Sequence, residues 1–255
     1  MKPSERLYAI FERVEKTGEV SLSELSESFD VSEMTIRRDV DRLVVEGAVQ
    51  LNLGKVIRGS SGSYEPPFTI RAERNAAQKT AIASAVARSL KDRQTVLLDG
   101  GSTGVAVAKE LSHRILTVCT PSLKVANVLA HAPDIQLIIT GGNVRRGEES
   151  LVGQTAIATL NSFRFDTYVM TVSGISLTHG FTEWNEADAA IKRTALAVSS
   201  ECVVAADSSK VDRVAFSHVA DLSAVSKLIT DDGISKSQRA SIVDAGVELE
   251  VVENF

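Results

Sequence analysis

The residues near the amino terminus best suited to chemistry are three arginines, Arg37, Arg38 and Arg42. Guanidinium groups bind phosphate oxygens and base edges, so several on one helix surface would suit DNA. An apolar stripe at helical spacing is formed by Ile36, Val40, Leu43 and Val44. At about 100° per residue, the side chains that point away from this stripe are Met34, Thr35, Arg38 and Arg42, with Arg37 on its flank.

The segments around these arginines predict a helix-turn-helix over residues 20–39. Ser21 and Glu24 have the spacing of a capping box that opens one helix, Ser32 caps the next, and Gly47 is expected to end it. Residues 48–58 contain two short apolar runs around a turn, which predicts a β-hairpin, the wing. The residues that we expect to contact DNA are Ser21, Ser32, Glu33, Met34, Thr35, Arg37, Arg38, Arg42 and Lys55.

Net charge argues mildly against a nucleic-acid partner, because the chain carries −5 at neutral pH. Residues 1–58 hold nine Lys and Arg against eleven Asp and Glu, so this region is itself slightly acidic. The charges are nevertheless segregated, with acidic side chains before Ser32 and arginines after it. Charge distribution decides such cases better than net charge. A three-helix bundle with a solvated basic face remains the alternative.

A Gly/Ser-rich stretch divides the chain into two predicted domains. Residues 3–58 form the first, residues 59–66 a linker, and residues 67–255 the second. In the second, apolar runs occur at 95–98, 115–119, 135–139, 168–172, 202–206, 227–230 and 247–252. Amphipathic or Ala-rich stretches between them predict helices at 76–90, 103–112, 121–131 and 186–200. This alternation predicts an α/β domain with a doubly wound parallel sheet.

Small and polar residues follow most of the predicted strands. In a parallel sheet, these carboxyl ends meet at one edge, where ligands bind. Glycines allow close backbone approach, and hydroxyls with helix N-termini suit a phosphate, for which Lys192 and Lys210 would supply positive charge. The expected effector-binding residues are Lys79, Asp99, Gly100, Gly101, Ser102, Thr103, Thr120, Ser122, Gly141, Gly142, Asp188, Lys192, Asp207 and Lys210.

The first domain is very similar to the amino-terminal domain of DeoR-type bacterial transcriptional regulators. The match is carried by Val31-Ser-Glu-Met-Thr-Ile-Arg-Arg-Asp-Val40, followed by Leu43 and Gly47. The resemblance implies a winged helix-turn-helix that binds double-stranded operator DNA, most commonly as a repressor. The wing departs from the family, because Leu53-Gly54-Lys55 stands where a His-Gly-Gly is usual.

From Pro67 to about Gly233 the chain resembles the sensor domain of the same regulators. The match includes Asp99-Gly-Gly-Ser-Thr103, Gly141-Gly142, Leu151-Val-Gly153 and Ala206-Asp-Ser-Ser-Lys210. The resemblance implies a fold like ribose-5-phosphate isomerase and glucosamine-6-phosphate deaminase, and a phosphorylated sugar or related metabolite as effector. Two departures affect the ligand site: Pro121 replaces a usual Asn, and Asp188 replaces a usual Glu before Lys192.

Two other classes of function are weighed against a regulator. An isomerase or deaminase could use the carboxylates of Asp99, Glu183, Glu186 and Asp207, but the four histidines do not cluster with them in sequence. An adaptor that grips a partner protein is the other alternative. For a regulator we expect no catalytic residue, metal or cofactor, a homo-oligomer (dimer or tetramer), and a bacterial cytosolic location near the nucleoid.

The remaining composition is consistent with a cytosolic regulator. Cys119 and Cys202 lie inside apolar runs and are expected to be reduced thiols in the core. The charged amino terminus has no signal-peptide pattern, and no apolar stretch is long enough to cross a membrane.

Overall fold

A computed structural model describes residues 3–45, 48–58 and 65–253. The chain divides into two compact units, Met1–Asn75 and Ala76–Phe255. We predicted that the second domain begins at residue 67, but residues up to Asn75 belong to the first unit. The physical reason is the helix α4 (Phe68–Glu73), whose Ile70 is buried in the hydrophobic core of that unit. Of the predicted linker at 59–66, residues 59–64 lie outside the described residues.

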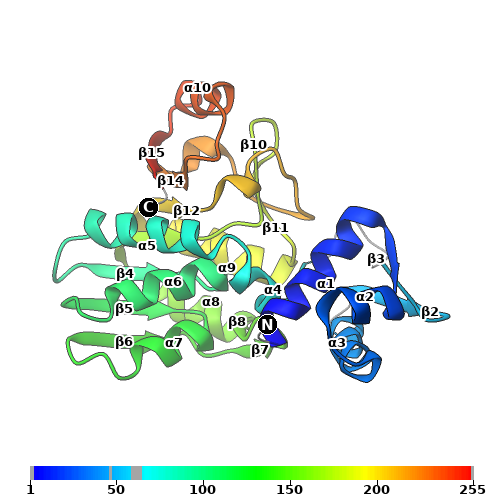
Figure 1. Cartoon of the computed structure of the whole chain (residues 1–255). Helices are drawn as coiled ribbons and strands as arrows, with labels where there is room; N and C mark the ends of the chain where they lie inside the picture. The colour runs from blue at the N-terminus through cyan, green and yellow to red at the C-terminus, as the bar shows by residue number, and fades with distance from the viewer. Residues whose placement is uncertain (1–2, 46–47, 59–64, 254–255) are drawn as a thin grey trace. The chain divides into compact units, whose positions relative to one another are not determined.

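The first unit is built from short helices and a small antiparallel sheet (Figure 1). Its elements are α1 (Pro3–Thr17), β1 (Glu19–Ser21), α2 (Leu22–Phe29), α3 (Glu33–Val45), β2 (Val49–Asn52), β3 (Lys55–Arg58) and α4. β2 and β3 form the predicted hairpin, and β1 pairs with β3. The core joins Ile10 and Val14 of α1, Leu25 of α2, and Ile36 and Val40 of α3. These apolar stripes hold the two helices of the motif against α1.

Two features of α3 differ from the prediction. Val44, which we placed in the apolar stripe, is 38% exposed. The helix also buries Asp39, which we did not place in the stripe. The carboxylate of Asp39 accepts a hydrogen bond of 2.5 Å from Nε of Arg6 on α1. This buried ion pair fixes α3 on α1, because separating the partners would leave a charge without compensation. The predicted helix stop at Gly47 lies outside the described residues.

The second unit has the predicted parallel sheet. The seven strands run in the order β15-β14-β12-β9-β4-β5-β6, and each neighbouring pair is parallel. Their bounds are β4 (Thr95–Leu98), β5 (Leu116–Thr120), β6 (Ile135–Ile139), β9 (Phe165–Met170), β12 (Ser199–Ala205), β14 (Lys227–Asp231) and β15 (Glu248–Val252). The order reverses at β4, which lies between β5 and β9 and defines a topological switch point.

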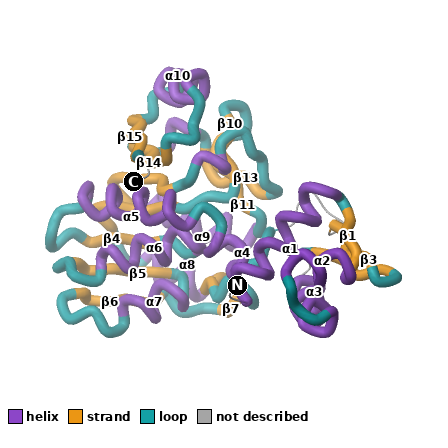
Figure 2. The backbone as a smooth tube through the Cα atoms, in the orientation of Figure 1, coloured by secondary structure: helices purple, strands orange, loops and turns teal. Residues whose placement is uncertain are grey.

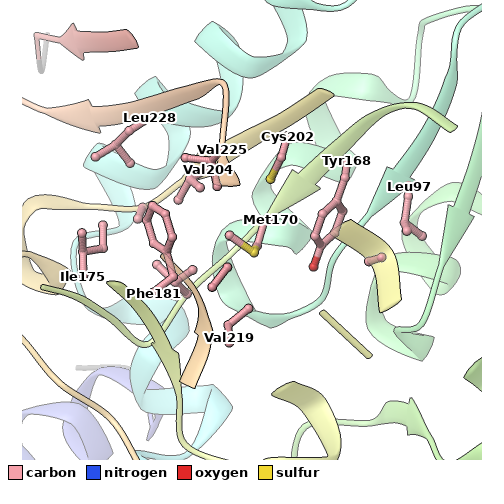
Figure 3. Close-up of a cluster of buried hydrophobic side chains, with 14 of the residues drawn as sticks. Leu97, Tyr168, Met170, Ile175, Phe181, Cys202, Val204, Val219, Val225 and Leu228 are labelled. Carbon is pink, nitrogen blue, oxygen red and sulfur yellow. The ribbon is translucent and has the colours of Figure 1, made fainter. Parts of the chain in front are cut away.

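Helices cover both faces of this sheet, as Figures 1 and 2 show. They are α5 (Ala76–Ser89), α6 (Gly101–Leu111), α7 (Leu123–Leu129), α8 (Gln154–Asn161), α9 (Glu186–Ala197) and α10 (Lys236–Asp244). Val96 and Leu98 of β4 pack with α5 and α6, while Leu97 faces the opposite cluster, which includes α8 and α9. Figure 3 shows part of this second cluster, with Tyr168, Met170 and Phe181. Burial on both faces explains the apolar run Val96–Leu98 in the central strand β4.

Several short elements were not predicted. They are the hairpin β7 (Asn143–Arg145) and β8 (Ser150–Val152), α8, α10, two 3-10 turns at Ser208–Lys210 and Leu222–Ala224, and a second sheet of β10 (Gly174–Ser176), β11 (Gly180–Glu183) and β13 (Ser217–Ala220). Strands of three or four residues are too short to show a period in sequence. The hairpin, named here the β7–β8 hairpin, proves important for the site.

Both cysteines are free and buried, as predicted, and burial raises the pKa of the Cys119 thiol to about 12. Within the described ranges, no helix has the length and apolar character that a membrane span requires.

Candidate functional site: an arginine-bearing helix and a charged sheet edge

The predicted recognition surface of α3 is exposed. Arg37, Arg38 and Arg42 are all exposed, and among the described residues none of them has an ion-pair partner. Met34, on the same surface, is 70% exposed. Guanidinium groups that the fold does not engage are available to a phosphate or a guanine edge at no cost in internal contacts. The surface that the sequence predicted is therefore assembled on one helix.

The polar residues around the start of α3 have structural roles as well. Ser32 caps the helix by accepting a hydrogen bond from the Thr35 amide, at 3.3 Å, and the two hydroxyls lie 2.9 Å apart. Ser21 forms the predicted capping box with Glu24, so its hydroxyl is engaged within α2. In the wing, Lys55 pairs with Glu19 at 2.6 Å, and both side chains are more than half exposed. An exposed pair of this kind is weak enough to exchange for a phosphate.

At the carboxyl edge of the second unit's sheet, Asp99 follows β4 at the switch point. Its Oδ1 accepts from the Gly100 amide at 2.8 Å. Its Oδ2 accepts from the Thr171 amide at 3.1 Å, beyond the end of β9, and from the ammonium of Lys192 on α9. Asp99 therefore joins the two strands that flank the switch point, where ligands of parallel α/β proteins bind.

Lys192 is buried and shared by two carboxylates. Besides Asp99, it pairs with Glu183 of β11 at 3.2 Å and donates to the Thr171 carbonyl at 2.8 Å. Burial alone would lower the pKa of Lys192, but the charges of Asp99 and Glu183 raise it. We name Asp99, Glu183 and Lys192 the inner cluster. We predicted Lys192 as a cation for phosphate, and the structure shows its charge already balanced.

Glu183 is also held in its ionised form. Burial alone would raise its pKa, but the charge of Lys192 and hydrogen bonds from the Ser173 hydroxyl and the Trp184 amide together lower it. The sequence had suggested Glu183 only as one possible acid–base group of an enzyme. Its place beside Lys192 depends on the short strand β11, which no periodicity revealed.

A second ion pair lies next to the inner cluster, between the β7–β8 hairpin and α9. Arg145 lies 2.6 Å from Asp188, with side chains 23% and 13% exposed. The Arg145 Nε also donates to the hydroxyl of Ser150 across the hairpin, at 3.3 Å. We name Arg145 and Asp188 the outer pair. Arg145 was missed in the sequence, where only the basic pair after Gly141-Gly142 could have indicated it.

The glycines and hydroxyls of the sheet edge bring the neighbouring loops together. Gly101, Ser102 and Thr103 form the first turn of α6, for which Gly100 is the N-cap without a side-chain cap. A Cβ on Gly100 would lie 3.2 Å from Cβ of Ser122, which caps α7. Thr120 accepts from the Ser122 amide at 3.2 Å, so both hydroxyls support this loop.

The β7–β8 hairpin lies against the same loops. Ser150 forms a bridge with Ser122, and the Leu151 amide donates to the Pro121 carbonyl at 2.6 Å. Gly142, with φ of +110°, starts the hairpin, and a Cβ there would lie 2.6 Å from the carbonyl of Val152. Gly141 precedes it, also with positive φ. The hairpin therefore needs glycine at this point to pack closely.

The remaining predicted residues lie farther along the fold. Asp207 and Lys210 follow β12, which β9 separates from β4, and Asp207 caps the short 3-10 turn through the Ser209 amide at 3.1 Å. Lys79 is buried on α5, with 5% of the residue exposed. The structure brings Asp99 and Lys192 into direct contact.

A cavity of about 410 Å³ lies at the opposite, amino-terminal edge of the sheet. It is lined by residues that begin strands, among them Asp166, Ser226, Lys227 and Glu248. Three of its charged side chains are engaged locally, because Lys227 pairs with Glu248 at 3.0 Å and Asp166 accepts a hydrogen bond from the Thr95 amide at 2.8 Å. We therefore place the candidate site at the carboxyl edge. In the part of the chain that the structure describes, no group of side chains fits a metal ion.

Comparison with protein families identifies the class of the molecule. Residues 6–61 match the DeoR-like helix-turn-helix domain, and residues 74–232 match the DeoR C-terminal sensor domain. The chain belongs to the DeoR family of DNA-binding transcriptional regulators. This confirms the predicted resemblance, with its winged helix-turn-helix followed by an α/β domain.

Similar curated proteins extend over the full length. A glycerol-3-phosphate regulon repressor of Escherichia coli strain K12 is 31% identical, covering 98% of this chain and 100% of the relative. An uncharacterised HTH-type transcriptional regulator of the same strain, YgbI, is 33% identical, and the match covers 100% of both chains. These names indicate regulators of transcription and not enzymes.

Solved structures align with part of this chain. Ribose 5-phosphate isomerase A from Methanocaldococcus jannaschii aligns with a TM-score of 0.41 and 17% identity, over 54% of this chain and 55% of the isomerase. The delta subunit of eIF2B from Chaetomium thermophilum aligns with a TM-score of 0.45 and 18% identity, over 61% of this chain and 56% of the subunit.

Proposed function

We propose that the protein represses a carbohydrate or related catabolic operon and leaves its operator when a phosphorylated metabolite binds the second unit. The observation that supports DNA binding most directly is the exposed, unpaired set of Arg37, Arg38 and Arg42 on α3 of a DeoR-family chain. The protein acts in the bacterial cytosol, as a dimer or tetramer. A symmetric helix-turn-helix dimer reads two half-sites about 34 Å apart or a multiple of that distance.

The DNA part is tested by selecting duplexes from a random pool with the full chain and measuring affinity for the selected sequence. Replacing Arg38 with Ala should weaken binding by about 1–3 kcal/mol, or roughly 5- to 150-fold. The charge-matched control is Arg88→Ala, an exposed arginine on α5, which should bind as the parent does. Equal affinity of the Arg38 and Arg88 variants would contradict the assignment of α3 as the recognition helix.

The effector part depends on the sheet edge at the switch point. The first turn of α6, which has no side-chain cap, presents backbone N–H groups of the kind that bind phosphate, and glycines and capping hydroxyls lie beside it. A full-length relative is named as a glycerol-3-phosphate regulon repressor, which supports a phosphorylated polyol or sugar as the class of effector. A ligand switches the protein only if it binds the DNA-free state more tightly than the DNA-bound state.

The experiment for this part is a thermal-shift screen of phosphorylated sugars and polyols on the full chain, followed by DNA titration with each compound that stabilises it. At a concentration 100 times its Kd, a ligand raises stability by about 2.7 kcal/mol. The proposal predicts a compound that both stabilises the protein and weakens operator binding. Compounds that stabilise the protein and leave DNA affinity unchanged would contradict the switch.

A further inference from the structure

The charges at the sheet edge raise a difficulty for an anionic effector. The inner cluster and the outer pair together hold two cations, Arg145 and Lys192, against three carboxylates. These five side chains carry a net charge of −1 when all are ionised. A phosphate monoester brings another −1.5 to −2 at neutral pH. A direct ion pair between phosphate and either of these cations requires that cation to change its partner.

Lys192 is poorly placed to make that change. It is 4% exposed, and it contacts Asp99, Glu183 and the Thr171 carbonyl at once. Moving its ammonium toward a ligand would leave two buried carboxylates without compensation, which is strongly unfavourable. The cation of the inner cluster therefore holds β4, β9 and α9 together.

The outer pair has the opposite properties. Arg145 is the more exposed of the two cations, with a side chain 23% exposed against 5% for Lys192. Its planar guanidinium matches a phosphate as well as it matches a carboxylate. Its partner Asp188 is more easily neutralised than Glu183, because burial raises the pKa of Asp188 even though Arg145 and Ser150 act to lower it. Arg145 can therefore exchange Asp188 for a phosphate while the inner cluster stays intact.

We propose that Arg145 binds the phosphate of the effector by exchanging Asp188 for it, and that this exchange releases the β7–β8 hairpin from α9. The inference rests on the proposed function, since it names the residue through which the effector acts. The hairpin is the element that would respond, because Arg145 ties it to α9 while Leu151 ties it to the loop after β5. Ligand binding thereby loosens the attachment of the hairpin to α9, while its attachments to the loop after β5 remain.

Inorganic phosphate is the probe, titrated into the full chain by calorimetry against chloride at equal ionic strength. Arg145→Gln should weaken phosphate binding at least about tenfold, because a charge-assisted bidentate contact is lost. Asp188→Asn should tighten it about fivefold or more, because Arg145 no longer has a competing carboxylate. The matched control is Arg146→Gln, the exposed neighbour on the same hairpin, which should bind as the parent does.

If Arg145→Gln folds poorly, its weaker phosphate binding is not informative. Asp188→Asn still tests the inference, because damage to the fold would weaken phosphate binding and not tighten it. Hydrogen exchange gives a second readout: phosphate should speed exchange of amides in residues 143–152 of the parent, and Asp188→Asn should show this faster exchange without phosphate. Equal phosphate affinity in parent, Arg145→Gln and Asp188→Asn overturns the inference. So does the absence of phosphate binding in both parent and Asp188→Asn. The DNA titration with sugar phosphates judges the proposed function separately.

Discussion

The two units use their cations in opposite ways. On α3 the arginines are exposed and unpaired among the described residues, whereas at the sheet edge Lys192 is buried between two carboxylates and Arg145 is paired with one. Exposed cations contribute little to folding and remain available to an outside anion. Buried, paired cations hold the fold and respond only when a partner is exchanged. The burial of a cation, more than its residue type, thus indicates whether it is available to bind DNA or is held in an ion pair within the fold.

The largest expected effect is on the inner cluster. Replacing Lys192 with Met leaves Asp99 and Glu183 buried without their cation, which should cost about 3–5 kcal/mol of unfolding free energy. Urea unfolding followed by fluorescence of Trp184, the single tryptophan of the chain, reports on the second unit. The control is Lys236→Met, an exposed lysine on α10, with an expected change below about 0.5 kcal/mol. A Lys192 variant that is as stable as this control would break the comparison.

A buried pair in the first unit extends the same reasoning. Arg6→Met leaves Asp39 buried and unpaired, and should destabilise that unit by about 3 kcal/mol. Arg37→Met, on the exposed surface of α3, should change stability by less than about 0.5 kcal/mol while weakening DNA binding. Hydrogen exchange of the α1 and α3 amides measures the stability of the first unit in both variants. If the two variants lose protection equally, burial does not distinguish the arginines.

On the acid side, Glu183 is the buried carboxyl group of the inner cluster whose titration should contribute to the pH dependence of stability. Its pKa in the folded chain is lowered, so its contribution is fully present above its unfolded value and is lost as pH falls through the folded value. Lys192 has a raised pKa, so its contribution is lost only in strongly alkaline solution. Asp188 has a raised pKa and acts in the opposite sense to Glu183, gaining a proton more readily when folded.

The parent chain should lose unfolding free energy as pH falls from about 5 to the acid transition, and Glu183→Gln should lose less. The difference should be about 1.4 kcal/mol for each unit by which the folded state lowers the pKa of Glu183. Urea midpoints measured across that range, for parent and variant, provide the test. Parallel curves for the two proteins would show that Glu183 is not held ionised as the geometry indicates.

The smallest expected effect is at the wing. Leu53 is 98% exposed and has φ of +47° in the turn before Gly54, a conformation that Asn adopts more readily than Leu. Leu53→Asn should stabilise the first unit by about 0.5–1 kcal/mol. Its melting temperature measures the gain. If the same variant weakens binding of selected DNA, the leucine is a contact of the wing, and if affinity is unchanged, the wing tip lies off the DNA.

Most of the fold was predictable because its signals are local. Capping serines, the stripe of Ile36 and Val40, and the buried apolar strands each follow from neighbouring residues. The seven predicted strand runs all correspond to strands of the sheet, within a few residues. The short strands β7, β8, β10, β11 and β13 did not show a period, and with them the sequence missed the places of Arg145 and Glu183.

The partnerships of charged residues were less predictable than their types. Lys192 and Asp99 are 93 residues apart in sequence, and only the switch-point topology brings them together. Arg6 and Asp39 are 33 residues apart, and the packing of α1 against α3 brings them together. Sequence patterns indicate which face of an element is apolar, but pairing of buried charges is set by how separate elements pack.

The most direct test of the account is the salt dependence of DNA affinity for the parent chain and for Arg37→Ala/Arg38→Ala/Arg42→Ala. For the parent, log K should fall linearly with log salt concentration, with a slope of about −0.9 for each phosphate neutralised. The triple variant should lose selected-sequence binding and show a slope shallower by about one for each phosphate contact removed, with unfolding unchanged. An identical slope and affinity for the two proteins would contradict the claim that the exposed arginines of α3 bind DNA.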